Sequence, residues 1–220
     1  MYDHVGRDVY SRTIFGARVS MTVGFSVALI AMVASTLIGL VAGYYRMADK
    51  TLMRVMDGLM SIPGILLAIA LMALLGGSVQ NVIIALCVVE TPRAVRIVRG
   101  AVLTLREQMY VDAAVAMGAP TYRILALHIL PNTLAPLVVQ ATFICAAAIL
   151  NEAYLSFLGA GPPPDVSSWG NVMAAGQNFI TAAIWIIFFP GLFLTLTILA
   201  INVAGDGLRD TLDPRLRRRM

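Results

Sequence analysis

The stretch VSMTVGFSVALIAMVASTLIGLVAGYY, residues Val19 to Tyr45, contains no Asp, Glu, Lys or Arg. A helix that crosses a bilayer needs about 20 largely apolar residues, so this stretch is long enough to span a membrane. The whole chain of 220 residues has the same character, since 59% of its residues are hydrophobic, 13% are charged and the mean hydropathy is +0.83. Soluble globular domains have about 25% charged residues. The sequence therefore predicts an all-α integral membrane protein.

The rest of the chain predicts four further spans, which makes five. The charge-free run from Gly58 to Val89 is too long for one crossing, and Gly76 to Ser78 interrupt it, so we expect two spans joined by a tight turn. The second of these starts at about Val79 and runs into charged residues that can reach the interface. The last two predicted spans are Pro131–Phe157 and Phe179–Val203.

Basic residues assign the loops to the two sides of the membrane, because loops rich in Lys and Arg stay in the cytoplasm. Such residues follow the first, third and fifth spans, whereas the loops at 76–78 and 159–178 contain none. The pattern predicts an extracytoplasmic segment at residues 1–18, a membrane domain at 19–204 and a basic cytoplasmic tail at 205–220. Three arginines in the first segment oppose its placement outside, so we expect a further span upstream of this sequence.

The longest predicted cytoplasmic loop, residues 99–131, has helix signals of its own. Thr104 and Glu107 have the spacing of a capping box, and Gly118 is a suitable helix terminator. The signals predict a first short helix over Leu105–Met117.

A second short helix is predicted from Pro120, which suits a first helical turn, to about Leu130. Its expected apolar stripe consists of Ile124, Leu125, His128 and Ile129. Asp112, Ala113, Ala114 and Ala116 present small side chains, which allow another surface to approach the backbone closely. Docking to a partner and simple capping of the bundle are equally compatible with this pattern.

No residue pattern indicates catalysis, a metal site or a nucleotide site in this chain. The only lysine, Lys50, follows an aspartate, so the phosphate-binding Gly-x-x-x-x-Gly-Lys motif is absent from the sequence. His4 and His128 lie in different segments, and Cys87 and Cys145 lie in apolar runs without metal-like spacing. The net charge of +4 comes from basic residues beside the spans, which indicates a membrane rather than nucleic acid. If the protein transports a solute, we expect the energy to come from another chain.

Individual residues within the spans suggest further roles. Gly39 and Gly43 form a small-xxx-small pair that suits close helix packing, either within the chain or against a second subunit. Pro190 interrupts the fifth span and is either a hinge or a static kink. We place Glu152 near the outer interface, where it lines a pathway, pairs with a cation or is merely hydrated. Glu90 is also expected near a membrane face.

The loop has a second, more specific pattern. Asp112, Ala113 and Ala114 are followed after three residues by Gly118, and after nine more by His128, Ile129, Leu130 and Pro131. This spacing resembles the Glu-Ala-Ala loop of ABC importer permeases, which reads Glu-Ala-Ala, three residues, Gly, nine residues, Ile-x-Leu-Pro. Asp112 keeps the charge of the usual Glu, and His128 stands at the first Ile, as in the peptide subfamily.

Nearly the whole chain is similar to the second permease subunit of dipeptide, oligopeptide and nickel importers. The other matching stretches are GRDVYSRTIFGARVSM at 6–21, LSFLGAG at 155–161, SWG at 168–170 and GDGLRDTLDPRL at 205–216. Members of this family have a first span before the GRD segment, and this sequence starts after it.

The resemblance implies a polytopic helix bundle in the bacterial inner membrane that forms half of a translocation pathway. Its implied partners are a second permease subunit, two ATPase subunits that bind ATP and Mg²⁺ in the cytoplasm, an extracytoplasmic solute-binding protein and membrane lipid. Residues 112–131 would couple the chain to an ATPase, while the chain itself would hold no cofactor and bind no nucleic acid. Dipeptide, oligopeptide, glutathione and a nickel complex all stay open as substrates. The alternative is a membrane scaffold or sensor subunit whose inner helices bind a partner without transport.

Overall fold

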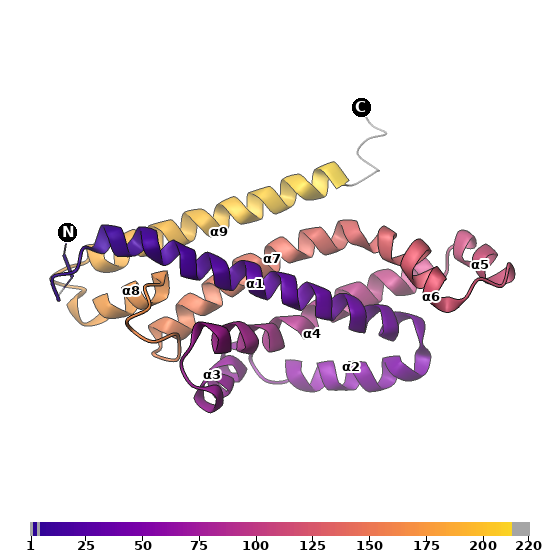
Figure 1. Cartoon of the computed structure of the whole chain (residues 1–220), viewed down its shortest axis with the longest axis horizontal. Helices are drawn as coiled ribbons and strands as arrows, with labels where there is room; N and C mark the ends of the chain where they lie inside the picture. Colours follow the sequence, from indigo (N-terminus) through magenta and orange to yellow (C-terminus); the bar gives the residue numbers. More distant parts are fainter. Residues whose placement is uncertain (1, 4, 213–220) are drawn as a thin grey trace.

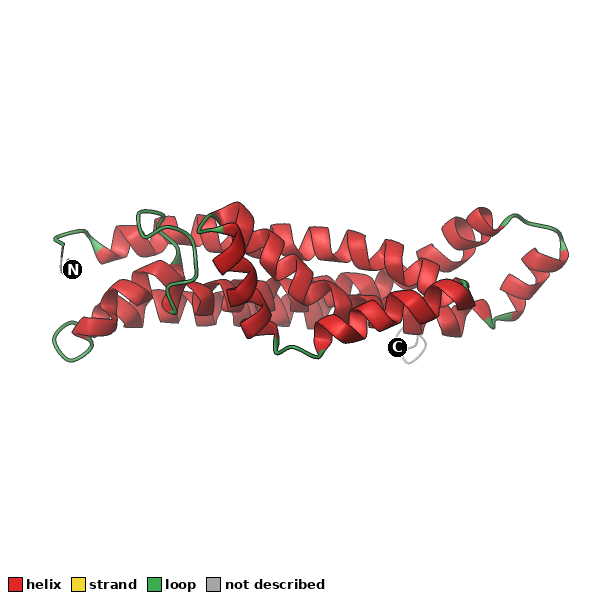
Figure 2. Cartoon of the chain, turned by 90° about the horizontal axis from the view of Figure 1, so that it is seen from below, coloured by secondary structure: helices red, strands yellow, loops and turns green. Residues whose placement is uncertain are grey.

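The computed structural model of the chain describes residues 2, 3 and 5–212. These residues form an elongated helix bundle (Figure 1), and apart from an isolated bridge between Tyr2 and Asp8 they contain no strand (Figure 2). The elements are α1 (Val9–Tyr44), α2 (Arg46–Met60), α3 (Gly64–Leu75), α4 (Val79–Arg106), α5 (Met109–Ala116), α6 (Thr121–Arg123), the π-helix η1 (Ile124–Ile129), α7 (Leu130–Phe157), α8 (Trp169–Gly176), the 3-10 helix η2 (Gln177–Phe179) and α9 (Trp185–Leu212). The all-α prediction is therefore confirmed.

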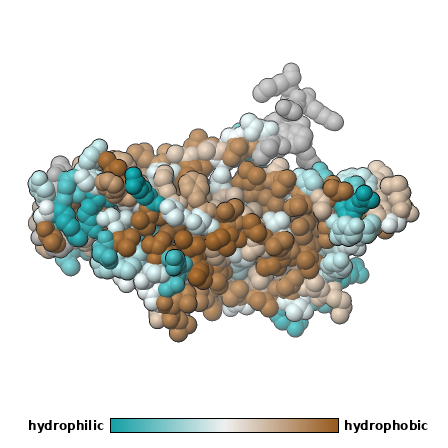
Figure 3. Space-filling view, viewed as in Figure 1, coloured by the Kyte–Doolittle hydropathy of each residue, from teal (hydrophilic) through white to brown (hydrophobic). Residues whose placement is uncertain are grey.

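The bundle has two polar ends and an apolar middle. One end carries α8 and the start of α1, and the other carries α5 and α6 (Figure 1); we call them the α8 end and the α5 end. On the face shown in Figure 3, hydrophobic residues cover most of the surface between the two ends. Three helical runs are long and apolar enough to cross a membrane, namely 9–44, 121–157 and 185–211, and the bent pair of α2 and α3 would make a fourth. The count of five spans stays a prediction.

Helix α1 begins at Val9, well before the predicted start of the first span at Val19. The carboxylate of Asp8 caps the helix by accepting a hydrogen bond from the backbone N–H of Ser11, at 2.9 Å. An acidic N-cap satisfies a donor that the first turn leaves unpaired, and it favours the positive end of the helix dipole. Residues 9–18 are therefore helical and continuous with the apolar stretch.

The span predicted to start at Gly58 is not one straight helix, because the chain bends between Met60 and Gly64. Helix α2 ends at Met60, α3 contains only 12 residues, and the two helices meet at 88°. Pro63 precedes α3 with extended dihedral angles, and a proline cannot donate the backbone hydrogen bond that would continue α2. Helix α2 instead folds back along α4.

Helices α1 and α4 pack closely at the two glycines singled out in the sequence. A Cβ added to Gly39 would lie 2.6 Å from Cβ of Val98, and one added to Gly43 would lie 2.6 Å from Cβ of Val102. From the first contact to the second, the chain advances by four residues in both α1 and α4, so the two helices run in the same direction. Two neighbouring backbones can approach this closely only where side chains are missing.

The predicted break between a short helix ending at Leu130 and a span starting at Pro131 is also wrong. Residues 121–157 form one continuous helical run. Pro131 has no N–H, and its ring disfavours an ordinary helical turn before it. The π-turns of η1 accommodate it: the N–H of Leu130 bonds to the carbonyl of Leu125, and Asn132 Nδ2 donates to the His128 carbonyl at 2.7 Å.

Two differences concern the end of the chain. The loop predicted at 159–178 contains helix α8, whose first residue Trp169 is buried. Helix α9 runs from Trp185 to Leu212, so it starts later than the span predicted at 179–203 and continues into the tail predicted from residue 205. The placement of that tail in the cytoplasm stays a prediction. Gly205 remains buried in α9, where an added Cβ would collide with Thr142 of α7, and this contact extends the packed helix. The basic residues of the predicted tail from Arg215 onward lie outside the described residues.

Candidate functional site

The predicted docking loop forms a projection at the α5 end (Figure 1). Helix α5 ends at Ala116, and Gly118, two residues further on, has a φ of +77°, in the left-handed region that favours glycine. The N–H of Gly118 bonds to the carbonyl of Val115 at 2.9 Å, and the N–H of Ala119 bonds to that of Ala114 at 3.1 Å. This pair of bonds is a Schellman motif, which ends a helix and reverses the chain. Gly118 thus stands where the sequence predicted a terminator.

The start of the first short helix differs from the prediction. Thr104 lies inside α4, where its hydroxyl donates to the carbonyl of Gly100 at 3.2 Å, so the expected capping box with Glu107 does not form. Helix α4 continues to Arg106 because Leu105 still packs against the core, and α5 starts only at Met109. Packing of a long helix outweighs a local capping signal here.

The inner face of α5 ties it to η1. Val111 and Ala114 are 2% exposed, and they belong to the same buried cluster as Ile124 and Ile129, which are 2% and 0% exposed. The ring of Tyr110 lies 6.4 Å from the ring of His128, centroid to centroid. Helix α5 and η1 therefore form one packed unit between the ends of α4 and α7.

The outer face of this unit is apolar. Met109, Met117, Tyr122 and Val115 are 88%, 81%, 75% and 52% exposed, and we call these four residues the tip surface. Asp112 and Ala113 are also exposed, as are Gly118 and Pro131, whereas His128 and Leu130 are half-buried. Exposed apolar patches rimmed by polar residues are typical of interaction sites, so the tip surface is a candidate contact surface. The structure thus brings the motif residues into one unit and adds Met109 and Tyr122, which lie outside the pattern used for the prediction.

Glu152 lies far from this unit, within the bundle. Its side chain is 0% exposed. Oε2 accepts a hydrogen bond from the Ser20 hydroxyl at 3.0 Å, and Oε1 accepts one from the Ser156 hydroxyl at 2.8 Å. The Ser20 oxygen in turn accepts the backbone N–H of Trp169 at 3.2 Å, so one carboxylate connects α1, α7 and α8. The interpretation of Glu152 as a hydrated residue is wrong, and its role in a pathway stays a prediction.

Pro190 is buried within α9, which continues through it as one helix. The neighbouring Gly191 carbonyl accepts the hydroxyl of Thr195 at 2.8 Å. A hinge at Pro190 stays a prediction, because the helix is described in one conformation.

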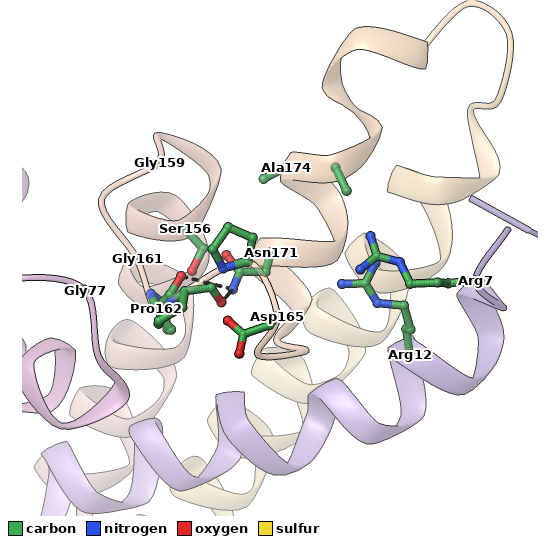
Figure 4. A pocket seen from close by; sticks show the side chains of 13 residues that line it. Arg7, Arg12, Gly77, Ser156, Gly159, Gly161, Pro162, Asp165, Asn171 and Ala174 are labelled. Atoms are coloured by element: carbon green, nitrogen blue, oxygen red, sulfur yellow. Dashed lines mark hydrogen bonds between the residues drawn. The ribbon is translucent and has the colours of Figure 1, made fainter. Parts of the chain in front are cut away.

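The α8 end contains a hollow of about 670 Å³ (Figure 4). Arg7 and Arg12 line one side of it, and Asn171 holds the other side, since its Nδ2 donates to the carbonyls of Pro162, Pro163 and Val166 at 3.2, 3.0 and 2.9 Å. Sequence reasoning missed this role of Asn171, because spacing alone does not show that one amide collects three carbonyls.

Asp3 organises the two arginines of this hollow. Its Oδ2 lies 2.8 Å from Nε of Arg7 and 3.0 Å from Nη1 of Arg12. Burial raises the pKa of Asp3, but the backbone N–H of Arg7, the Arg7 side chain and the N–H of Val5 outweigh it and bring that pKa down to about 2. The carboxylate is therefore charged at neutral pH and compensates both cations.

Among residues 2, 3 and 5–212, no group of three or more His, Cys, Asp or Glu side chains is placed to hold a metal ion. Both cysteines are buried and unpaired.

The sequence of this chain is similar to those of known membrane transport proteins. Residues 35–218 match the family model described as binding-protein-dependent transport system inner membrane component. A putative peptide transport system permease protein of Brucella suis is 52% identical over 215 residues, which are 98% of this chain and 73% of the relative. A dipeptide transport system permease protein of Alkalihalophilus pseudofirmus is 44% identical over 216 residues, 98% of this chain and 71% of the relative.

A glutathione transport system permease protein of Pectobacterium atrosepticum is 41% identical over 216 residues, 98% of this chain and 72% of the relative. Among solved structures, an inward-facing form of the MetNI methionine ABC transporter matches with a TM-score of 0.77 at 20% identity, covering 92% of this chain and 96% of that one. At this identity the match establishes the fold alone. With the family model covering most of its length, this chain belongs to the inner membrane components of binding-protein-dependent transport systems and has the helical fold of an ABC importer permease.

Proposed function

We propose that the chain is a permease subunit of an ATP-driven importer for peptides, and that residues 112–131 couple it to an ATPase subunit. The observation that carries the coupling role is the exposed tip surface on a unit packed between α4 and α7. Relatives at 41–52% identity are named as permeases for peptides, dipeptides and glutathione, which supports a peptide substrate.

The α5 end faces the cytoplasm in this proposal. Arg99, Arg106 and Arg123 lie at or near this end, in keeping with the preference of basic residues for the cytoplasmic side. The α8 end, with its hollow beside Arg7 and Arg12, then faces the solute-binding protein.

The tip surface suits a cleft in another protein. Met109, Met117 and Tyr122 project apolar groups that gain about 25 cal/mol per Å² when they leave water. Methionine adapts its shape to a partner because it is unbranched. The ATPase subunits bind ATP and Mg²⁺ and supply the chemistry, while this chain supplies the surface that moves.

Movement of the partner would pass through the α5–η1 unit. Because Val111 and Ala114 are buried against this unit's core, displacement of α5 carries η1 with it. Helix α5 follows α4, and η1 leads into α7, so a shift of the unit changes the relative positions of two long helices. Such a rigid-body movement would alternate access to the two sides of the membrane.

The test is ATP-dependent uptake of radiolabelled alanyl-alanine by proteoliposomes that contain this chain, its second permease, both ATPase subunits and the binding protein. A Met117→Asp variant places a charge on the tip surface, and we expect loss of ATPase association and of uptake. Met47→Asp is the control, because Met47 is 82% exposed but lies on α2, outside the tip surface.

Equal uptake in both variants and in the unmodified transporter would show that the tip surface is not the coupling site. Binding of a partner without any uptake would instead favour a scaffold or sensor subunit.

A further inference from the structure

Glu90 and Arg93 lie on α4 at a depth where charged side chains are unfavourable. Helices α1 and α4 run in parallel, and Sγ of Cys87 lies 4.0 Å from the carbonyl oxygen of Val27. Val27 lies within the charge-free stretch Val19–Tyr45, about 12 Å from its first residue at 1.5 Å per residue. Glu90 and Arg93 lie one and two turns further along, near the middle of this stretch. The expectation that Glu90 lies near a membrane face is therefore wrong.

Two hollows meet at these side chains. One of about 250 Å³ lies between the α2–α3 junction, α4 and α7, and one of about 490 Å³ lies between α4, α7 and α9. Glu90 and Arg93 line both of them. Asn151 lines the first, where its Nδ2 donates to Glu90 Oε1 at 3.1 Å, and Gln140 and Asn202 line the second. We call these five residues the polar cluster.

The polar cluster has bonding capacity that this chain does not use. Arg93 is exposed, and no residue within 5–212 makes a hydrogen bond or a close ion pair with its guanidinium, whose charge interacts with the Glu90 carboxylate at longer range. Oδ1 of Asn202 is buried and has no hydrogen-bond partner among the described atoms. A charged side chain at the centre of a bilayer costs about 2.5 to 3.5 kcal/mol on insertion scales, so such residues face a bundle interior or a water-filled cavity. This face of the bundle is therefore not a lipid face.

We propose that the polar cluster is the part of the translocation pathway that contacts the solute, and that it selects a zwitterion. The Arg93 guanidinium binds the carboxylate of the solute and the Glu90 carboxylate binds its ammonium group. The side-chain amides of Gln140 and Asn202 donate hydrogen bonds to the carbonyl oxygen of the peptide bond and accept a hydrogen bond from its N–H. The inference rests on the proposed function and adds to it the contact residues and the charge pattern of the solute.

The spacing of the two charges supports this assignment. Residues three apart on a helix lie on one face, with Cβ atoms about 5–6 Å apart. An extended chain spans about 3.3–3.6 Å per residue, so the ends of a dipeptide are separated by a similar distance. Arg93 also offers a planar fork of donors that matches a carboxylate, which a lysine does not.

Chemical exchange of the two charges tests the proposal. Each variant, Arg93→Cys or Glu90→Cys, is prepared in the complete transporter in proteoliposomes. It is then treated with one of two methanethiosulfonate reagents: one adds a positively charged trimethylammonium group to the cysteine, and the other adds a negatively charged sulfonate. The probes are radiolabelled alanyl-alanine and trialanine, and reagent is removed before the binding protein is added. Cys87 and Cys145 are buried, so the unmodified transporter serves as the blank. Arg96→Cys is the matched control, because Arg96 lies on the same helix but pairs with Asp57 at 2.6 Å outside both hollows.

We expect Arg93→Cys to lower initial uptake about tenfold, the size expected for loss of one charge-assisted hydrogen bond. The trimethylammonium reagent should restore much of this loss and the sulfonate should not. For Glu90→Cys the two reagents should have the reverse effects. In a separate assay, peptide and binding protein are present during the labelling reaction, and the solute should slow the reaction at both cysteines. Arg96→Cys should transport normally with either reagent.

Two results would overturn the inference: equal effects of both reagents, or no reaction at either cysteine in the assembled complex. The second would mean that the polar cluster packs against the other permease subunit. Failure of the proposed function is distinguishable, because the unmodified transporter would then show no ATP-dependent uptake at all.

Discussion

Replacement of Gly118 by valine tests whether the left-handed backbone conformation of this residue is needed to hold the turn between α5 and η1. The φ of Gly118 is +77°, and a Cβ added there would meet no atom within 4 Å, so the substitution causes backbone strain without a steric clash. The left-handed conformation costs an L-residue about 1–2 kcal/mol. A change of this size raises the population of the open α5–η1 turn about 5- to 30-fold.

Hydrogen exchange at the Ala119 amide measures this opening, because that N–H closes the turn onto the Ala114 carbonyl at 3.1 Å. We expect Gly118→Val to accelerate exchange by about 5- to 30-fold and to reduce ATPase retention and uptake. Gly118→Asn is the matched control, since asparagine tolerates the left-handed region better than valine, and it should lie close to the unmodified protein. If uptake falls equally in both variants while exchange is unchanged, the reasoning from backbone strain is refuted.

Three further predictions concern the bundle itself. Gly39→Ala should lower the free energy of unfolding in detergent by about 1–3 kcal/mol, because the added methyl group overpacks against Val98. Gly58→Ala is the control and should not lower it, since no atom lies within 4 Å of the added Cβ. Glu152→Leu should destabilise the bundle by about 1–3 kcal/mol, because two serine hydroxyls lose their acceptor; a denaturation midpoint equal to that of Glu152→Gln would contradict this. The pKa of Asp3 is lowered from 3.8 to about 2, so its contribution to stability is fully present above about pH 4 and is lost as the pH falls through about 2. Proteolysis of the N-terminal segment should therefore increase between pH 5 and pH 2, and Asp3→Asn should remove this dependence on pH.

Much of the α5–η1 unit was predictable from local signals. Gly118 ends a helix in the structure as its sequence position suggested, and the expected stripe is present, since Ile124 and Ile129 are buried with Leu125 and His128 half-buried beside them. The capping box at Thr104 failed because α4 continues through that position, held by packing that no local pattern contains. Pro131 suggested the start of a span, yet the π-turns before it keep the helix continuous.

The placement of charges was harder to predict. Glu152 lies near the end of its apolar run in the sequence, which suggested hydration, but serines from α1 and α7 surround its carboxylate. Glu90 closes a charge-free run, which suggested a membrane face. The parallel packing of α1 and α4 moves it to the middle of the apolar stretch instead. In both cases the environment of the side chain comes from residues distant in the sequence.

The sequence by itself determined that the protein is a bundle of membrane helices, because long apolar runs without charge are stable inside a bilayer. Residue spacing located the motif at 112–131. Only the tertiary structure decided which side chains face one another: the glycines of α1 against α4, Glu152 within its serines, and Glu90 with Arg93 between two hollows. The physical reason is that hydropathy and helix signals act over a few turns, whereas burial and hydrogen bonding depend on how whole helices pack.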